Sequence, residues 1–106
     1  MFWVYMLKCA DRSFYVGHTD NLEIRVGQHI HGIDPFCYTF SRRPVKLVYS
    51  QGFESREEAL VIERQIKGWN RAKKTALIAN DWAEISRISN FKYGKKSPST
   101  GSGRTD

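Results

Sequence analysis

Two short runs of strand-type residues, separated by a polar break, open the sequence. Residues 2–7 are apolar, aromatic and β-branched, and their run has the length of a buried strand rather than a helix. Strand-type residues resume at 14–17, after the turn at 10–13. We therefore predict a β-hairpin. Because side chains alternate along a strand, a register that pairs odd positions with odd positions would place Tyr5 and Tyr15 on one face, at diagonal distance.

A segment with helical spacing follows the hairpin. Asn21 is a suitable N-cap, residues 22–30 carry apolar side chains along one side, and Gly32 is a suitable end. We predict a helix there. Arg25 and His29 are four positions apart and so share one ridge of it. This placement suits two functional side chains, and it equally suits a solvated arginine and a histidine at the edge of the core.

A loop and a third strand come next. Residues 33–40 mix Asp, Pro and aromatic side chains, which predicts a loop packed by its own side chains. Residues 45–49 alternate apolar side chains with a lysine, which predicts a strand. Arg42 and Arg43 lie just before it. Such a pair can contact phosphates, but arginine pairs are also common on surfaces that bind nothing.

The clearest local signal is a capping box. Ser55 and Glu58 have the required spacing, and the apolar stripe after them predicts a helix that runs to Gly68 or Trp69.

One acidic residue of this helix is not explained by solvation. Glu63 falls on the apolar side of the helical wheel, between Ala59 and Leu60. A carboxylate there must be paired, protonated or bound to a cation, because burying it alone is costly. A structural ion pair with Arg25, Lys67 or a loop arginine is the alternative to a bound cation.

Basic residues gather where that helix ends. Residues 70–78 predict a short helix, and Lys67 and Arg71 belong to a basic cluster at its start. The cluster suits an ordinary exposed helix face as well as phosphate binding.

We assign residues 1–80 to one compact domain and residues 81–106 to a C-terminal extension, because 106 residues leave room for little more than one domain. The spacing at 81–90 permits one further short helix. The Gly/Ser/Lys-rich segment at 93–103 lacks an apolar pattern, and we expect it to be flexible.

Charge and cysteine content narrow the class of protein. The net charge of +6 and the pI near 9.6 favour a polyanionic partner. Cys9 and Cys37 are too few for a disulfide scaffold and lack metal-type spacing, so we expect free thiols. We find no export signal and no apolar run of membrane length, and we therefore expect a soluble cytoplasmic protein without a membrane partner.

The hairpin motifs resemble the signature of the GIY-YIG nucleases. Val4-Tyr5 and Tyr15-Val16-Gly17 stand for its two halves, although Trp3-Val4 replaces the usual Gly-Ile. The resemblance continues through Asn21-Leu22, Arg25 and His29, and then through Glu63 into the basic helix pair typical of the short bacterial branch of the family. It implies an α+β fold, a small three-stranded antiparallel sheet flanked by helices. It also implies a site on one sheet face, between the first helix and the Glu63 helix.

The resemblance also implies a role for each site residue. Glu63 would hold one divalent cation, Mg²⁺ or Mn²⁺, and Arg25 would clamp a phosphate oxygen. Tyr5 would act as the general base with His29 as its proton acceptor, and the order of these two stays open. Tyr15 would position the water or the phosphate. Gly17 would be a structural part of the motif.

The implied activity is metal-dependent, endonuclease-type hydrolysis of phosphodiester bonds. We expect DNA in preference to RNA, selectivity for structure or ends, a role in processing or repair, and guidance by a protein partner. A catalytically idle nucleic-acid-binding module is the second hypothesis, and an interaction protein for another acidic partner is the third. The residues expected to contact nucleic acid, beyond the catalytic ones, are His18, Arg42, Arg43, Lys67 and Arg71.

Overall fold

The structure is a computed structural model that describes residues 1–89. It divides into two compact units, Met1–Gly68 and a second that begins at Trp69, and each is described by itself. The domain boundary expected near residue 80 stays a prediction. The flexible segment expected at 93–103 lies outside the described residues.

The first unit is built on a three-stranded antiparallel sheet. Its strands are β1 (Phe2–Lys8), β2 (Phe14–Thr19) and β3 (Lys46–Phe53), and β1 lies between the other two. The predicted α+β fold with this sheet is confirmed. Tyr5 pairs with Gly17 and Leu7 pairs with Tyr15, so the odd-to-odd register is confirmed as well.

Two strands run further than the side-chain pattern predicted. β2 continues past Gly17 to Thr19, and β3 continues past Tyr49 to Phe53. Both extensions are paired with β1, where Trp3 faces Thr19 and Phe2 faces Phe53. Backbone hydrogen bonds to the central strand hold these residues in the sheet whatever their polarity.

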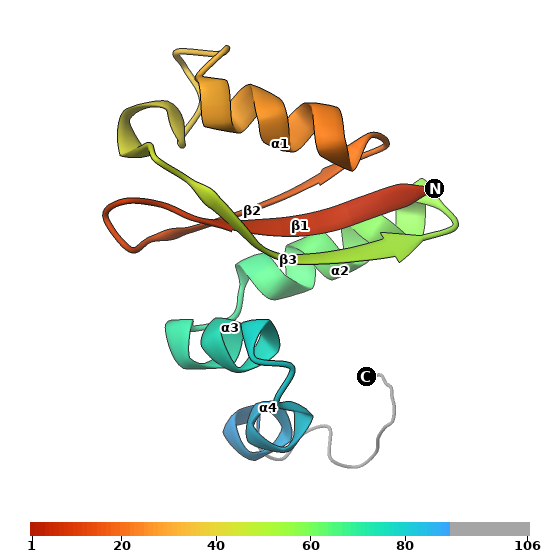
Figure 1. The fold of residues 1–106 in the computed structure, drawn as a ribbon. Coiled ribbons are helices and arrows are strands. Elements are labelled where there is room, and N and C mark those ends of the chain that lie inside the picture. Colours follow the sequence, from red (N-terminus) through yellow and green to blue (C-terminus); the bar gives the residue numbers. More distant parts are fainter. Residues whose placement is uncertain (90–106) are drawn as a thin grey trace. The chain divides into compact units, whose positions relative to one another are not determined.

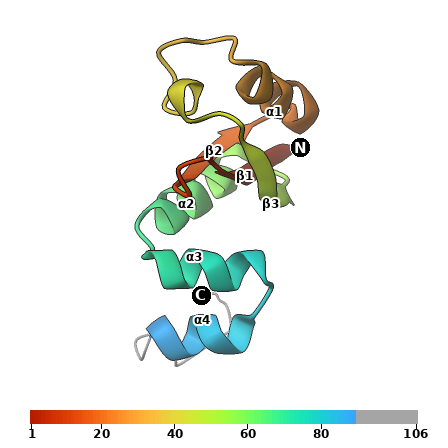
Figure 2. The same ribbon diagram turned by 60° about the vertical axis from the view of Figure 1, so that its left-hand side comes forward.

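Two helices cover opposite faces of the sheet. Figure 1 shows α1 (Leu22–His31) on one side and α2 (Arg56–Lys67) on the other, and Figure 2 shows the same arrangement after rotation. The predicted caps are present. The Asn21 side chain accepts a hydrogen bond from the Ile24 amide, and Gly32 ends α1 at φ 64°, a left-handed conformation that suits glycine.

The second helix starts at the predicted capping box. The Ser55 hydroxyl accepts from the Glu58 amide, and the Glu58 carboxylate accepts from the Ser55 amide. The helix ends at Gly68, as expected.

The core has one layer on each face of the sheet. On the α1 side, buried residues of β1 and its neighbours pack with partly buried side chains, and the set comprises Tyr5, Leu7, Cys9, Val45, Tyr15, Leu22 and Val26. Alternation turns the buried residues Val4, Met6 and Val16 to the other face. There α2 presents Ala59 and Ile66, which are also buried.

The loop after α1 is held by specific contacts and ends in a short 3-10 turn, η1 (Phe40–Arg42). The Arg42 guanidinium lies 3.8 Å from the centre of the Tyr38 ring, and the Ala10 amide donates to the Arg42 carbonyl at 2.9 Å. Thr39 is almost fully buried. The predicted loop is present, but its packing by its own side chains is only partial, because Ile33 and Phe36 are exposed.

The second unit contains α3 (Arg71–Ile78) and α4 (Trp82–Ser89). Asn70 caps α3, and Ala76, Leu77 and Ile85 are the buried apolar residues of the pair. Among the described residues, no helix combines the length and the apolar character needed to cross a membrane.

A glycine-to-alanine change tests why Gly17 stands opposite Tyr5. A Cβ atom at position 17 would lie 2.6 Å from the Tyr5 hydroxyl oxygen and 2.8 Å from the ring carbon that carries it. Gly17→Ala should therefore lower the free energy of unfolding by about 1–3 kcal/mol, as overpacking does. Denaturant melts measure it.

Gly27→Ala is the matched control, because a Cβ atom there meets nothing within 4 Å. In the interior of α1 it should raise stability by up to about 1 kcal/mol. Equal effects of the two changes would contradict the steric explanation.

Candidate active site

A buried hydrogen bond joins the sheet to α1. The Tyr5 hydroxyl lies 2.9 Å from His29 Nε2, and the two residues are 0% and 5% exposed. β1 supplies the tyrosine and the third turn of α1 supplies the histidine. Because Gly17 has no side chain, the Tyr5 ring can lie against β2 and reach the imidazole.

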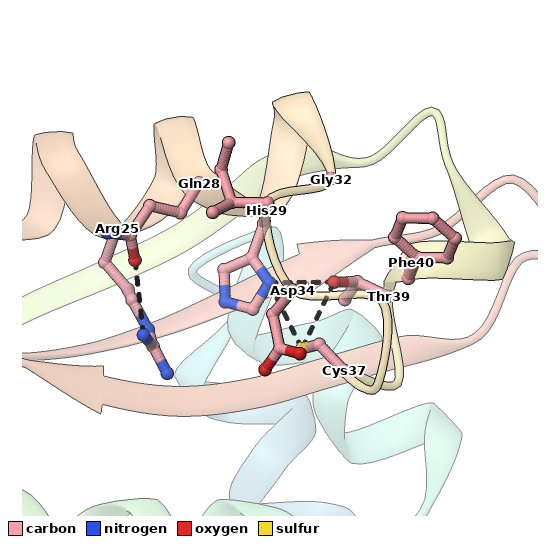
Figure 3. A pocket seen from close by; sticks show the side chains of 9 residues that line it. Arg25, Gln28, His29, Gly32, Asp34, Cys37, Thr39 and Phe40 are labelled. Carbon is pink, nitrogen blue, oxygen red and sulfur yellow. Dashed lines mark hydrogen bonds between the residues drawn. The ribbon is translucent and has the colours of Figure 1, made fainter.

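The other nitrogen of the imidazole is held by the loop after α1. His29 Nδ1 lies 2.8 Å from Thr39 Oγ1, which in turn donates to Cys37 Sγ at 3.5 Å. Figure 3 shows these three side chains pointing toward one another. Sequence reasoning missed Thr39. The only signal available was a small polar residue between two aromatic ones, which does not identify a functional side chain.

Tyr15 completes the group on this side of the sheet. Its ring centre lies 5.0 Å from that of His29 and 6.3 Å from that of Tyr5. The Tyr38 ring stacks on Tyr15 with centres 6.1 Å apart. The two tyrosines and the histidine predicted as catalytic are therefore in mutual contact.

Arg25 brings a positive charge to the same place. Its guanidinium is near enough to the Tyr5 phenol to lower the pKa of that phenol, while its Nη1 donates to Gln28 Oε1 at 3.2 Å. Arg25 and His29 also line a cavity of about 110 Å³ beside the loop after α1 (Figure 3). Arg25 and His29 thus lie on the same face of α1, as the helical spacing predicted, and their catalytic roles stay a prediction.

Burial fixes the protonation states of this pair. It raises the pKa of Tyr5 to about 12, although the hydrogen bond from Arg25 acts in the opposite direction. Burial also lowers the pKa of His29, and the positive charge of Arg25 lowers it further. At neutral pH Tyr5 is therefore a neutral phenol and His29 a neutral imidazole.

Glu63 lies on the other side of the sheet. His18 Nδ1 lies 2.8 Å from Glu63 Oε1, and Lys67 Nζ lies 3.0 Å from Glu63 Oε2. The ion pair with Lys67 was one of the predicted alternatives, and it is confirmed. The expectation of a site on a single sheet face is wrong, because His18 alternates with Gly17 along β2 and so points to the α2 side, where it bonds to Glu63.

The two sides come together at the edge of the sheet. β2 is an edge strand, and its Tyr15 interacts electrostatically with Arg25 on one side and with Lys67 and Glu63 on the other. Burial is the main reason that the pKa of Tyr15 is raised. The candidate site therefore wraps around β2, with Tyr15 between its two parts.

The loop arginines are engaged by the protein itself. Arg42 Nε donates to Asp11 Oδ2 at 3.1 Å, and its Nη1 donates to the Tyr38 carbonyl at 2.8 Å. Arg43 Nε donates to the Phe40 carbonyl at 2.9 Å. Contact of Arg42 and Arg43 with nucleic acid stays a prediction.

Arg71 begins α3 in the second unit, where it is exposed, and its predicted contact with nucleic acid is likewise untested.

The comparison with protein families decides the identity of this fold. A family model described as the GIY-YIG catalytic domain matches residues 1–76. The chain belongs to this family. GIY-YIG domains are of nuclease type and bind nucleic acid, so the resemblance seen in the hairpin motifs is confirmed.

Relatives and solved structures agree with this assignment. The chain is 43% identical to a UPF0213 protein of Natronomonas pharaonis over 79 residues, 74% of this chain and 92% of the relative. It is 46% identical to one of Clostridium perfringens over 80 residues, 76% and 85% of the two chains. UPF0213 proteins form a short GIY-YIG family.

Two solution NMR structures are similar in fold. The UPF0213 protein of Bacillus halodurans has a TM-score of 0.51 and 33% identity, with 86% of this chain and 100% of that chain covered. A protein of E. faecalis has a TM-score of 0.52 and 32% identity, with 76% and 85% covered.

GIY-YIG nucleases generally use a divalent metal. Glu63 is the residue predicted to bind it, and its surroundings show whether it can act as a ligand. In the described part of the chain, no group of three or more His, Cys, Asp or Glu side chains is placed to hold a metal ion. A single carboxylate nevertheless fits Mg²⁺, which prefers oxygen and often takes its other ligands from water and phosphate. The Lys67 ammonium now beside Glu63 is largely exposed and could be displaced.

The lowered pKa of His29 makes stability depend on pH. Unfolded His29 takes up a proton near pH 6.5, whereas folded His29 stays neutral to lower pH. The unfolded state therefore binds more protons in this window, and stability should fall as the pH drops from about 7 through 6.5 and below. Chemical unfolding at several pH values measures the slope.

His29→Asn should flatten this slope, and His31→Asn, a change at an exposed histidine of the same helix, should leave it as in the wild type. A wild-type slope retained by His29→Asn would show that another group causes it.

Proposed function

We propose that the protein hydrolyses phosphodiester bonds of nucleic acids and that Tyr5 and His29 transfer the proton of the attacking water. The observation that carries this proposal is the buried hydrogen bond between the Tyr5 hydroxyl and His29 Nε2, at 2.9 Å, beside the Arg25 guanidinium. A phenol that is already bonded to a neutral imidazole can pass on a proton without first becoming a free phenolate.

The proton moves in a relay. Water gives a proton to the Tyr5 oxygen while the Tyr5 proton moves to His29 Nε2, so hydroxide forms. No free phenolate forms on the way, which matters because the Tyr5 phenol has a pKa of about 12. The hydroxide attacks phosphorus, the bond to the leaving oxygen breaks, and that oxygen takes a proton from solvent. His29 then releases its proton to solvent.

Arg25 opens the way to Tyr5 and neutralises charge on the phosphate. Tyr5 has no exposed surface, and the exposed Arg25 side chain is near enough to lower the pKa of its phenol. When a phosphate binds, the guanidinium turns to its oxygens, which its planar donors match, and the phenol becomes accessible to water. Tyr15, partly exposed at the sheet edge, positions the water or the phosphate.

Glu63 would hold one Mg²⁺ or Mn²⁺, which would act as a Lewis acid toward the phosphate and the leaving group. When the ion is absent, Lys67 forms an ion pair with this carboxylate and His18 hydrogen-bonds to it. Their own contact with phosphate would follow once the ion has taken their place.

DNA is the proposed substrate, cut by structure or at ends in processing or repair within the cytoplasm. The net charge of +6 favours a polyanion. Selection by shape or through a partner protein is part of this proposal.

A catalytically idle nucleic-acid-binding module is the second candidate. Two observations favour it: both Glu63 oxygens are already paired, and Tyr5 is fully buried. One assay distinguishes the two candidate functions. It measures binding and cleavage of labelled single-stranded, double-stranded, flapped and branched DNA in the presence of Mg²⁺ or Mn²⁺. Binding of this panel without cleavage would favour the idle module.

Arg25→Ala tests the phosphate clamp. It should reduce the cleavage rate by on the order of 10²-fold or more, because transition-state charge is left without its donor. The melting temperature should change little, since Arg25 is exposed. Arg56→Ala, which removes the same charge from the exposed first turn of α2, is the control and should cleave normally. A strongly destabilised Arg25→Ala protein would reveal a structural role instead.

Glu63→Gln and Lys67→Met test whether Glu63 binds the divalent cation. Mn²⁺ at ten times its Kd should stabilise the wild type by about 1.4 kcal/mol, and Glu63→Gln should abolish this shift. Lys67→Met removes the ammonium from Glu63 Oε2, so the same shift should appear at lower Mn²⁺. Lys46→Met, at an exposed position of β3, should behave as the wild type. A Glu63→Gln protein that is destabilised but responds to Mn²⁺ unchanged would rule out this ligand.

A further inference from the structure

We propose that Thr39 is a positioning residue that fixes the tautomer of His29, keeping the proton on Nδ1 so that Nε2 is free to accept from Tyr5. This inference rests on the proposed function, in which Nε2 receives a proton. It concerns a loop residue that no motif marks. Thr39 is 1% exposed, so its hydroxyl must find its partners inside the protein.

The Tyr5 side of the imidazole requires Nε2 to be the acceptor. A buried phenol must donate its proton to some acceptor. The polar side chains at the Tyr5 oxygen are Arg25 and His29, and a guanidinium has donors only. The Tyr5 proton therefore points to Nε2, and the imidazole proton has to be on Nδ1.

The loop side supplies the matching acceptor. A hydroxyl has one proton and two acceptor lone pairs. Thr39 donates its proton to Cys37 Sγ at 3.5 Å, which leaves a lone pair for Nδ1–H at 2.8 Å. In the opposite tautomer Nε2–H and the Arg25 guanidinium would both donate to the Tyr5 oxygen. The phenol proton would then have no acceptor.

The same contacts serve both charge states of the imidazole. When Nε2 takes the Tyr5 proton, the imidazolium donates from both nitrogens, and Thr39 still accepts from Nδ1. No hydroxyl has to rotate during the transfer. The side chain of Thr39 thus acts through His29, without contact to the substrate or the reacting atoms.

Several titratable groups surround His29 and bear on its pH response. They come from β1, β2, α1 and the loop, and they are Tyr5, Tyr15, Arg25, Asp34 and Cys37. Thr39 itself does not titrate, so exchanging it changes the hydrogen bond to His29 without adding or removing a charge.

The test measures the tautomer directly. Two-bond ¹H–¹⁵N spectra of the isolated wild-type protein should show His29 protonated on Nδ1 and unprotonated on Nε2. Thr39→Val keeps the shape but removes the hydroxyl, so Nδ1–H keeps only the weaker sulfur acceptor Cys37 Sγ at 3.7 Å, and the Nε2–H form should appear. Thr39→Ser keeps the hydroxyl and should restore the wild-type spectrum.

Cleavage kinetics follow on the same three proteins. Thr39→Val should lower kcat by on the order of 10²-fold, shift the acid limb of the pH profile and leave KM unchanged, while Thr39→Ser should recover most of kcat. An Nε2–H tautomer in the wild type would overturn the proposal, even if Thr39→Val fails to fold. So would a Thr39→Val spectrum identical to that of the wild type. If the tautomers behave as expected but the wild type cleaves no nucleic acid, the assignment of Thr39 stands and the proposed function fails.

Discussion

The hydrogen bond between Tyr5 and His29 depends on one absent side chain. Gly17 pairs with Tyr5 across the ladder, and any Cβ atom there would collide with the phenol. The space left by Gly17 lets the phenol stay inside the core and still reach α1. Burial then raises the pKa of Tyr5 and lowers that of His29. The packing that builds the core therefore also sets the direction in which a proton can move.

Local signals made most of the fold predictable. The caps at Asn21, Gly32 and Ser55 are short-range chemistry, and they fix where the helices begin and end. The full length of β3 was not predictable from its pattern. Its last residues, up to Phe53, are in the sheet because β1 offers them backbone partners, a contact between segments more than forty residues apart.

The candidate site was predictable only where periodicity reaches it. Strand parity brought Tyr5 and Tyr15 together, and helical spacing added Arg25 and His29. No strand or helix periodicity places Thr39, because it lies in a loop. Its position is set by long-range contacts of that loop, such as the hydrogen bond from the Ala10 amide to the Arg42 carbonyl. Glu63 stood out in the sequence. The sheet face on which Glu63 lies could not be predicted. A helical wheel shows which side of a helix is apolar, but it does not show which face of the sheet that helix covers.

The charge of Arg25 gives the proposed relay a dependence on substrate. In the free protein this charge lowers the pKa of His29, so the imidazole holds a proton weakly. A bound phosphate would neutralise the guanidinium and remove that effect, so the proton affinity of His29 would rise when a phosphodiester is in place. In the proposed function, Tyr5 would become accessible to water in the same event, because the guanidinium turns toward the phosphate. Proton transfer from water is thereby favoured only when there is a bond to cleave.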